Sequence, residues 1–233
     1  EIREGKIEED GWMSRANLTC PCCGNTTEAS ELKKQFKAET TSHRLLAVII
    51  DGDNGKEYRQ PTQDEIEMVE NIPVDETDRP NEQMPVKYTQ ALPSCTWGLD
   101  RWGGMFTDRQ LLAMQTFVKK LDDLKKELHP EESEYGKAVV TYLGILIDRI
   151  AVILTSYGRW DTSRENVQTP FSRQAIPFIF DFPEANPFGS TTGSLSNQLD
   201  WVIRYINSES KTFIPSICNN AASGDKSQFR EKE

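Results

Sequence analysis

The stretch TDRQLLAMQTFVKKLDDLKKEL, residues 107–128, decides the fold class of this 233-residue chain. Thr107 followed by Gln110 has the spacing of a capping box, in which two side chains satisfy each other's backbone N–H groups. Eight apolar side chains then recur at helical spacing: Leu111, Leu112, Met114, Phe117, Val118, Leu121, Leu124 and Leu128. This pattern predicts a long amphipathic helix that packs one face against the rest of the chain.

Two more helices are predicted on the C-terminal side of this stretch. Residues 133–157 contain YLGILIDRIAVILTSY, which is apolar nearly all round and interrupted only by Asp148 and Arg149. It is too short and too charged for a membrane span, so it predicts a central buried helix with Asp148 and Arg149 as a buried structural pair. A third amphipathic helix is predicted over residues 195–207.

The chain before residue 62 has the pattern of small β-rich structure. WMSRANLTCPCCGNTT, residues 12–27, predicts a strand that runs into a tight turn, and RLLAVIIDGDNGKEYRQP, residues 44–61, predicts a hairpin. Residues 29–39 between them predict one or two helical turns. The sequence thus favours an α+β chain with three parts: a β-rich region over 1–61, an acidic linker over 62–93 and a mainly helical domain over 94–233.

The linker is acidic and contains several prolines. Thr62 with Glu65 forms a second capping-box pattern and predicts a short helix. Pro73, Pro80, Pro85 and Pro93 then predict a long surface connection.

Composition restricts the setting of the protein. The net charge of −10 argues against a surface that coats nucleic acid generally, although a local basic face is compatible with it. No apolar run resembles a signal peptide or a membrane span, and the first residue is Glu rather than Met. We therefore expect a cytoplasmic piece of a longer protein, with no membrane partner.

Three of the five cysteines lie in CPCCG, residues 20–24. Cys20 and Cys23 have the Cys-x-x-Cys spacing of a zinc knuckle, in which a proline and a glycine shape a turn that directs two thiolates at one metal. A structural zinc site needs four ligands, and the chain has no second Cys-x-x-Cys. The sequence therefore predicts a half zinc ribbon with zinc as a possible cofactor; the alternative is a thiol-bearing turn without metal.

Arginines and aromatic residues cluster in WGLDRWGG (97–104), YGRWDTSRE (157–165) and PFSRQAIPF (170–178). Arginines contact phosphates and aromatic rings stack on bases. The candidate DNA contacts are Arg101, Arg109, Arg159, Arg164 and Arg173, with Trp160 as a stacking residue. In the alternative interpretation the aromatics belong to the core and the arginines pair with neighbouring carboxylates.

No motif in the chain predicts catalysis. Neither histidine accompanies a serine or cysteine motif, and GSTTGS, residues 189–194, lacks the lysine of a phosphate-binding loop. In DFPEANPFG, residues 181–189, Asn186-Pro187-Phe188 resembles part of an amino-methyltransferase loop, which holds a flipped base. Because no Gly-rich cofactor motif accompanies it, we interpret it as a structural turn and predict no catalytic or cofactor-binding residue.

Several of these strings, taken in order, resemble zinc-ribbon-containing adenine-specific DNA methylases. They are CPCCG, RLLAVIIDG with GKEYRQP, WGLDRWGGMFTDRQLLAMQTF, and RWDTSRENVQTPFSRQAIPFIFDFPEANPFG. The resemblance runs from about residue 1 to residue 207. Its most distinctive parts are FTDRQLLA and FSRQAIP followed by DFPEANPF.

The resemblance implies a location within such an enzyme. Family members carry an S-adenosylmethionine motif near the N-terminus, a later Asp-Pro-Pro-Tyr catalytic loop, and a further cysteine pair upstream of the segment that matches Glu1. Neither the cofactor motif nor the catalytic loop is present here. We therefore expect an internal domain that recognises DNA or braces the remaining methyltransferase domains, with S-adenosylmethionine bound by the parent protein and this chain inactive alone. The alternatives are a non-catalytic scaffold or protein-interaction module and, as a second rival, an active methyltransferase.

Overall fold

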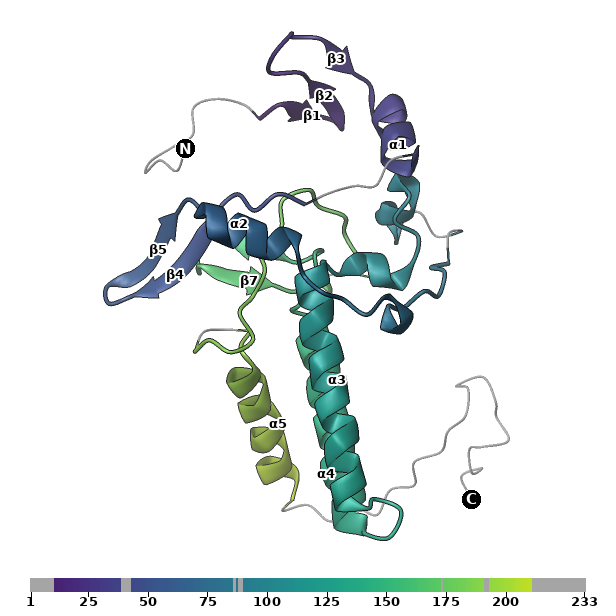
Figure 1. The fold of residues 1–233 in the computed structure, drawn as a ribbon, viewed down its shortest axis with the longest axis vertical. Helices are drawn as coiled ribbons and strands as arrows, with labels where there is room; N and C mark the ends of the chain where they lie inside the picture. Colours follow the sequence, from purple (N-terminus) through teal and green to yellow (C-terminus); the bar gives the residue numbers. More distant parts are fainter. Residues whose placement is uncertain are drawn as a thin grey trace, which may run out of the picture.

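A pair of long helices stands beneath a layer of small sheets and loops in the computed structural model (Figure 1). The structure describes residues 11–38, 43–85, 87, 90–172, 174–190 and 193–210, which contain five α-helices and three antiparallel sheets. The predicted α+β class is confirmed at this level. The zinc-ribbon character of the N-terminal sheet stays a prediction.

The N-terminal part forms a three-stranded sheet followed by a helix. Strands β1 (Met13–Ser14), β2 (Asn17–Thr19) and β3 (Thr26–Thr27) pair in that order. Helix α1 (Ala29–Ala38) is longer than the one or two turns predicted, and its first backbone N–H donates to Asn17 Oδ1 at 2.9 Å. The sheet therefore holds the start of the helix.

The predicted hairpin and the short helix after it are confirmed. Strand β4 (Val48–Gly52) pairs with β5 (Gly55–Arg59), and α2 (Gln63–Glu70) begins with the complete capping box of Thr62 and Glu65. Arg59 also pairs with Glu65 at 2.6 Å, and this hydrogen bond is the largest of the effects that lower the pKa of Glu65 to about 2. The strand end and the helix start are thus joined by one carboxylate.

The prediction of a surface connection over residues 62–93 is wrong near its end. Met84 is 2% exposed and Leu92 is buried, and both pack against Met105 and Tyr157. Burying a methionine or leucine side chain stabilises a fold by about 1.5–3 kcal/mol. This segment also includes the 3₁₀ helix η1 (Glu76–Asp78), and two more 3₁₀ helices follow, η3 (Pro93–Trp97) and η4 (Trp102–Met105).

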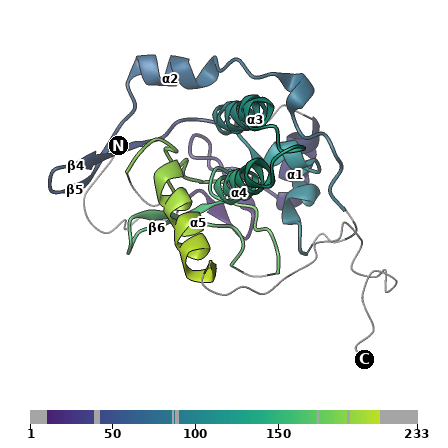
Figure 2. The ribbon, with the colours of Figure 1, turned by 90° about the horizontal axis from the view of Figure 1, so that it is seen from below.

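The two long helices form an antiparallel hairpin. Helix α3 (Asp108–Leu128) begins with the predicted capping box, in which Thr107 Oγ1 accepts from the Gln110 backbone and Gln110 Oε1 from that of Thr107. It is followed by α4 (Glu134–Ala151), whose Leu146 and Ile150 pack against α3 together with Leu154. Figure 2 shows the two helices nearly end on, side by side.

Helix α4 differs from its prediction in two respects. It ends at Ala151 instead of residue 157, and it is not buried all round, because Tyr135 is 76% and Ile145 44% exposed. Asp148 and Arg149 are both exposed, so the predicted buried pair is wrong, and Arg149 Nη2 donates to Gln198 Oε1 at 2.9 Å. One apolar face of α4 thus remains uncovered.

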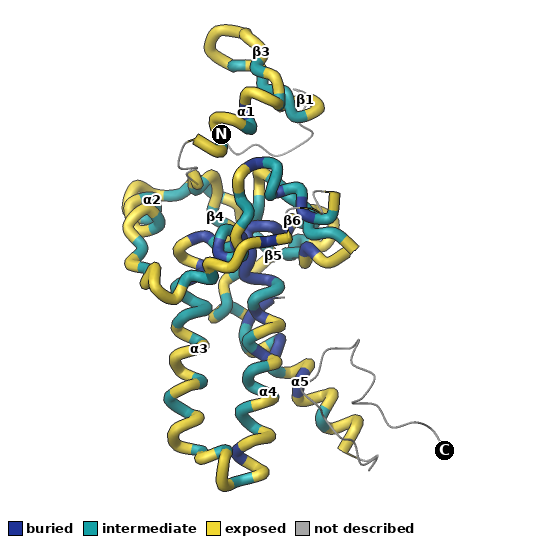
Figure 3. Tube along the Cα trace, turned by 90° about the vertical axis from the view of Figure 1, so that its right-hand side faces the viewer, coloured by how far each residue is buried: buried dark blue, intermediate teal, exposed yellow. Residues whose placement is uncertain are grey.

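The last described helix, α5 (Leu195–Glu209), lies beside α4. It confirms the predicted third helix, and Leu195 and Leu199 pack against the cluster of Leu146 and Ile150. Figure 3 shows α4 between α3 and α5, with α5 diverging toward its C-terminal end. No helix of the described residues combines the length and the apolar character that a membrane crossing needs.

Candidate nucleic-acid interface

A short hairpin carries two of the candidate DNA contacts. Strand β6 (Arg159–Asp161) pairs with β7 (Asn166–Gln168). In the turn, Asp161 Oδ1 accepts from the backbone N–H of Ser163 at 2.9 Å and from its hydroxyl at 2.7 Å. These bonds, of which the hydroxyl contributes most, lower the pKa of Asp161. The Asp161 carboxylate therefore stabilises the turn by accepting hydrogen bonds from Ser163.

The second carboxylate of this hairpin, that of Glu165, accepts a hydrogen bond from the β4–β5 hairpin. Tyr58 Oη, on β5, donates to Glu165 Oε1 at 2.8 Å. Burial, assisted by this hydrogen bond, raises the pKa of Tyr58. The Tyr58 ring also meets the Trp160 ring edge to face, with centroids 6.4 Å apart. The β4–β5 and β6–β7 hairpins thus form one surface.

Arg159 and Arg164 are exposed on this two-hairpin surface. Within the described part of the chain, neither guanidinium group takes part in an ion pair or a side-chain hydrogen bond. Their two nearest carboxylates in sequence, Asp161 and Glu165, accept hydrogen bonds from a serine and a tyrosine instead. Both guanidinium groups are consequently available to an anionic ligand.

Trp160 does not share the face of Arg159. Successive side chains of a strand point to opposite faces, and the Trp160 ring is half-buried against Tyr58. The tryptophan therefore braces the two hairpins against each other, and the structure does not bring it together with Arg159 as a stacking platform.

Arg101 and Arg109 are both held by the fold. Arg101 Nη1 donates to the backbone oxygen of Asn81 at 2.5 Å. Arg109 forms an ion pair with Glu184, whose other oxygen accepts from the Thr107 hydroxyl at 2.7 Å. These contacts tie residues 181–189 to the start of α3. Arg173 lies outside the described residues and stays a candidate on its sequence alone.

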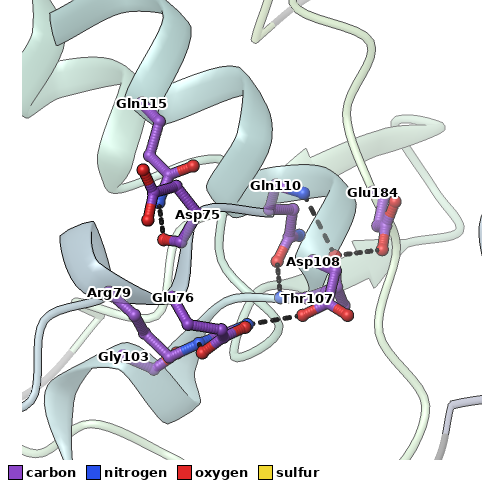
Figure 4. Close-up of polar contacts among 9 residues, drawn as sticks. All are labelled: Asp75, Glu76, Arg79, Gly103, Thr107, Asp108, Gln110, Gln115 and Glu184. Atoms are coloured by element: carbon purple, nitrogen blue, oxygen red, sulfur yellow. Dashed lines mark hydrogen bonds and ion pairs between the residues drawn. The ribbon is translucent and has the colours of Figure 1, made fainter. Parts of the chain in front are cut away.

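The start of α3 is a dense polar junction (Figure 4). Arg79 donates to Glu76 Oε2 at 2.7 Å and to Asp108 Oδ1 at 2.6 Å. About two turns further along the helix, Gln115 Nε2 donates to the backbone oxygen of Asp75 at 2.7 Å. The carboxylates of Glu76 and Asp108 both pair with Arg79, so this junction joins segments that lie apart in the sequence.

The cysteine turn, residues 20–24, is closed by hydrogen bonds around Cys20. The backbone N–H groups of Cys23 and Cys22 donate to the Cys20 sulfur and lower the pKa of its thiol. Gly24, at a φ of 74°, closes the turn with a bond from its N–H to the Cys20 carbonyl oxygen at 2.9 Å. Within the described ranges no three His, Cys, Asp or Glu side chains gather around a common point. Zinc bound by Cys20 and Cys23 therefore stays a prediction.

Sequence reasoning did not predict the β6–β7 hairpin or the role of Tyr58. A local signal for the turn existed, since Asp161 followed by Ser163 is typical of an Asx-turn. The contact of Tyr58 with Glu165 joins residues 107 positions apart, and a single sequence carries no signal for it.

Comparison with known proteins gives no relative: no family model, curated protein or solved structure matches the chain.

Proposed function

We propose that this chain is an internal DNA-recognition and bracing domain of an S-adenosylmethionine-dependent adenine-specific DNA methyltransferase. The methylase proposal is supported by the ordered motifs of the sequence, from CPCCG to DFPEANPF. The DNA-binding proposal is supported by one observation: all four described candidate arginines are exposed, but Arg101 and Arg109 have partners in the fold, whereas the guanidinium groups of Arg159 and Arg164 have none among the described residues.

In this proposal the two arginines contact phosphates. Phosphate contacts fix the register and orientation of a protein on a duplex, whereas base contacts read the sequence. The two-hairpin surface is suited to the first task, because Tyr58 connects the two hairpins through its contacts with Glu165 and Trp160. Methyl transfer belongs to the cofactor motif and catalytic loop of the parent enzyme, and this chain holds the duplex.

Duplex binding by the 233-residue chain tests the proposal. We expect fluorescence anisotropy with a labelled duplex of about 20 base pairs to show weaker binding for Arg159→Ala/Arg164→Ala. The slope of log K against log salt should fall by about 2, because each lost phosphate contact removes about one unit.

The matched control is Lys119→Ala/Lys120→Ala, which removes the same charge from exposed positions of α3. This control should bind DNA like the unmodified chain. If both double variants lose affinity equally, general electrostatics explains the binding; if neither does, the arginines are not DNA contacts. Either result overturns the proposal.

A further inference from the structure

A groove of about 310 Å³ runs between α4 and α5. Its six lining residues come from both helices: Tyr142, Ile145, Arg149, Trp201, Val202 and Tyr205. Tyr, Trp and Arg are enriched at protein interfaces, where they form most of the residues that dominate binding energy. The groove thus has the composition of an interface core.

The groove residues recur at spacings of three and four along each helix. Tyr142, Ile145 and Arg149 form one stripe on α4, and Trp201 and Tyr205 form another on α5. Ile145, Trp201 and Tyr205 are between 44% and 59% exposed. Such stripes pack side chains into a third helix that lies along them.

The charge of the groove specifies the partner further. Arg149 lines one end, and the Arg204 guanidinium lies 5.5 Å from the centre of the Trp201 ring at the rim. Among the described residues no carboxylate lines the groove, although the chain as a whole carries a net charge of −10. Two cations beside an apolar floor are complementary to a helix whose apolar stripe is flanked by carboxylates.

We propose that the α4–α5 groove binds an acidic amphipathic α-helix of a protein partner. Ile145 and Val202 form the apolar floor, Trp201 and Tyr205 cover the sides of the bound helix, and Arg149 and Arg204 pair with its carboxylates. Stacked bases of a single-stranded nucleic acid fit the aliphatic floor and the heptad spacing less well. This proposal does not depend on DNA binding by the β6–β7 hairpin.

Anisotropy with two fluorescent peptides tests it. Both are about 21 residues, or three heptads, with leucine at the a and d positions. One carries glutamate and the other lysine at the flanking e and g positions. Each is kept at a nanomolar concentration so that it does not self-associate. We expect the 233-residue chain to bind the glutamate peptide, and to bind the lysine peptide at least about 10-fold more weakly.

Variants then locate the site. Trp201→Ala and Arg149→Gln/Arg204→Gln should each weaken binding of the glutamate peptide about 10-fold or more, the second with a smaller effect at high salt. Val118→Ala, an exposed apolar residue of α3 outside the groove, and Arg159→Ala/Arg164→Ala should leave it unchanged. Circular dichroism checks that each variant keeps its helices.

Three results overturn the proposal. The first is equal binding of the two peptides, and the second is no binding of the glutamate peptide at protein concentrations up to about 100 µM, where even weak affinity would be detected. The third is unchanged binding of the glutamate peptide by the Trp201→Ala chain. Displacement of the peptide by an oligothymidylate, with Trp201→Ala weakening oligothymidylate binding directly, would identify a nucleic-acid surface and would likewise overturn it.

Discussion

The hydroxyl group of Tyr157 is buried in the core without a hydrogen-bond partner among the described residues. The residue is 2% exposed, and its Oη has no hydrogen-bond partner within the described residues. Burial raises its pKa to about 12. The ring is nonetheless well placed, because it packs against Met84 and Leu92 and meets Phe178 edge to face at 6.0 Å.

Replacing this hydroxyl should therefore stabilise the protein. We expect Tyr157→Phe to raise the free energy of unfolding by about 1 kcal/mol at neutral pH, because a buried unpaired hydroxyl group carries a desolvation penalty. The measurement is urea denaturation followed by circular dichroism. Equal or lower stability of the variant would mean that Tyr157 Oη has a partner in solution.

The same residue predicts a dependence on alkaline pH. The folded pKa of about 12 lies above the ordinary value of 10, so the unfolded chain releases this proton first. The contribution of Tyr157 to stability is complete below about pH 10 and is lost as the pH rises toward 12. Between these values the free energy of unfolding should fall more steeply for the unmodified chain than for Tyr157→Phe.

At the scale of elements, the turn between α3 and α4 depends on one glycine. A Cβ atom at Gly136 would lie 2.5 Å from the carbonyl oxygen of Leu128, the last residue of α3. Its backbone N–H also donates the N-cap hydrogen bond of the helix to Ser133 Oγ at 3.1 Å. The start of α4 is therefore in direct backbone contact with the end of α3.

Two glycines of the same helix should respond in opposite directions to alanine. Gly136→Ala should lower the free energy of unfolding by about 1–3 kcal/mol, because the clash with a backbone oxygen forces the hairpin apart. Gly144→Ala should raise it by up to about 1 kcal/mol, because nothing lies within 4 Å of the added methyl group and alanine favours helix. Chemical denaturation compares the two, and a shared sign would contradict this description of the turn.

At the scale of the whole molecule, a small aromatic cluster joins the N-terminal part to the rest. The Phe36 ring, on α1, lies 5.1 Å from that of Trp97 and 5.9 Å from that of Phe180. Trp97 belongs to η3, which is close to α1 along this contact. The N-terminal part thus packs against the rest of the chain through Phe36, whose ring contacts Trp97 and Phe180, residues far from it in the sequence.

Removing Phe36 should loosen this connection selectively. In Phe36→Ala we expect faster hydrogen exchange in residues 11–38, with α3 and α4 unchanged, and a loss of about 2 kcal/mol in local stability because the ring is only half-buried. Phe188→Ala, at a ring that is 75% exposed, is the matched control and should change neither region. Acceleration throughout α3 and α4 would mean that the chain unfolds as one unit, against the predicted boundary at residue 61.

The features that the sequence predicted correctly depend on neighbours within a few residues. Thr62 with Glu65 and Thr107 with Gln110 cap their helices because the partners are three positions apart, and the β4–β5 turn brings together residues that flank it. The periodicity of 107–128 likewise identified α3 correctly. Local hydrogen bonds and helical spacing involve only residues close in the sequence, so they can be predicted without knowledge of the tertiary structure.

Tertiary contacts decided which of the candidate residues are free. The sequence offered five arginines as candidate contacts, yet Arg109 pairs with Glu184, whereas Arg159 and Arg164 have no ion pair among the described residues. The apolar pattern of α4 predicts that one of its faces is buried, but it does not predict which helix covers that face. Sequence alone therefore determined the existence of the helices, the caps of α2 and α3 and the β4–β5 hairpin. The exposed arginines and the open α4–α5 groove were decided by the tertiary structure, because burial depends on partners distant in the chain.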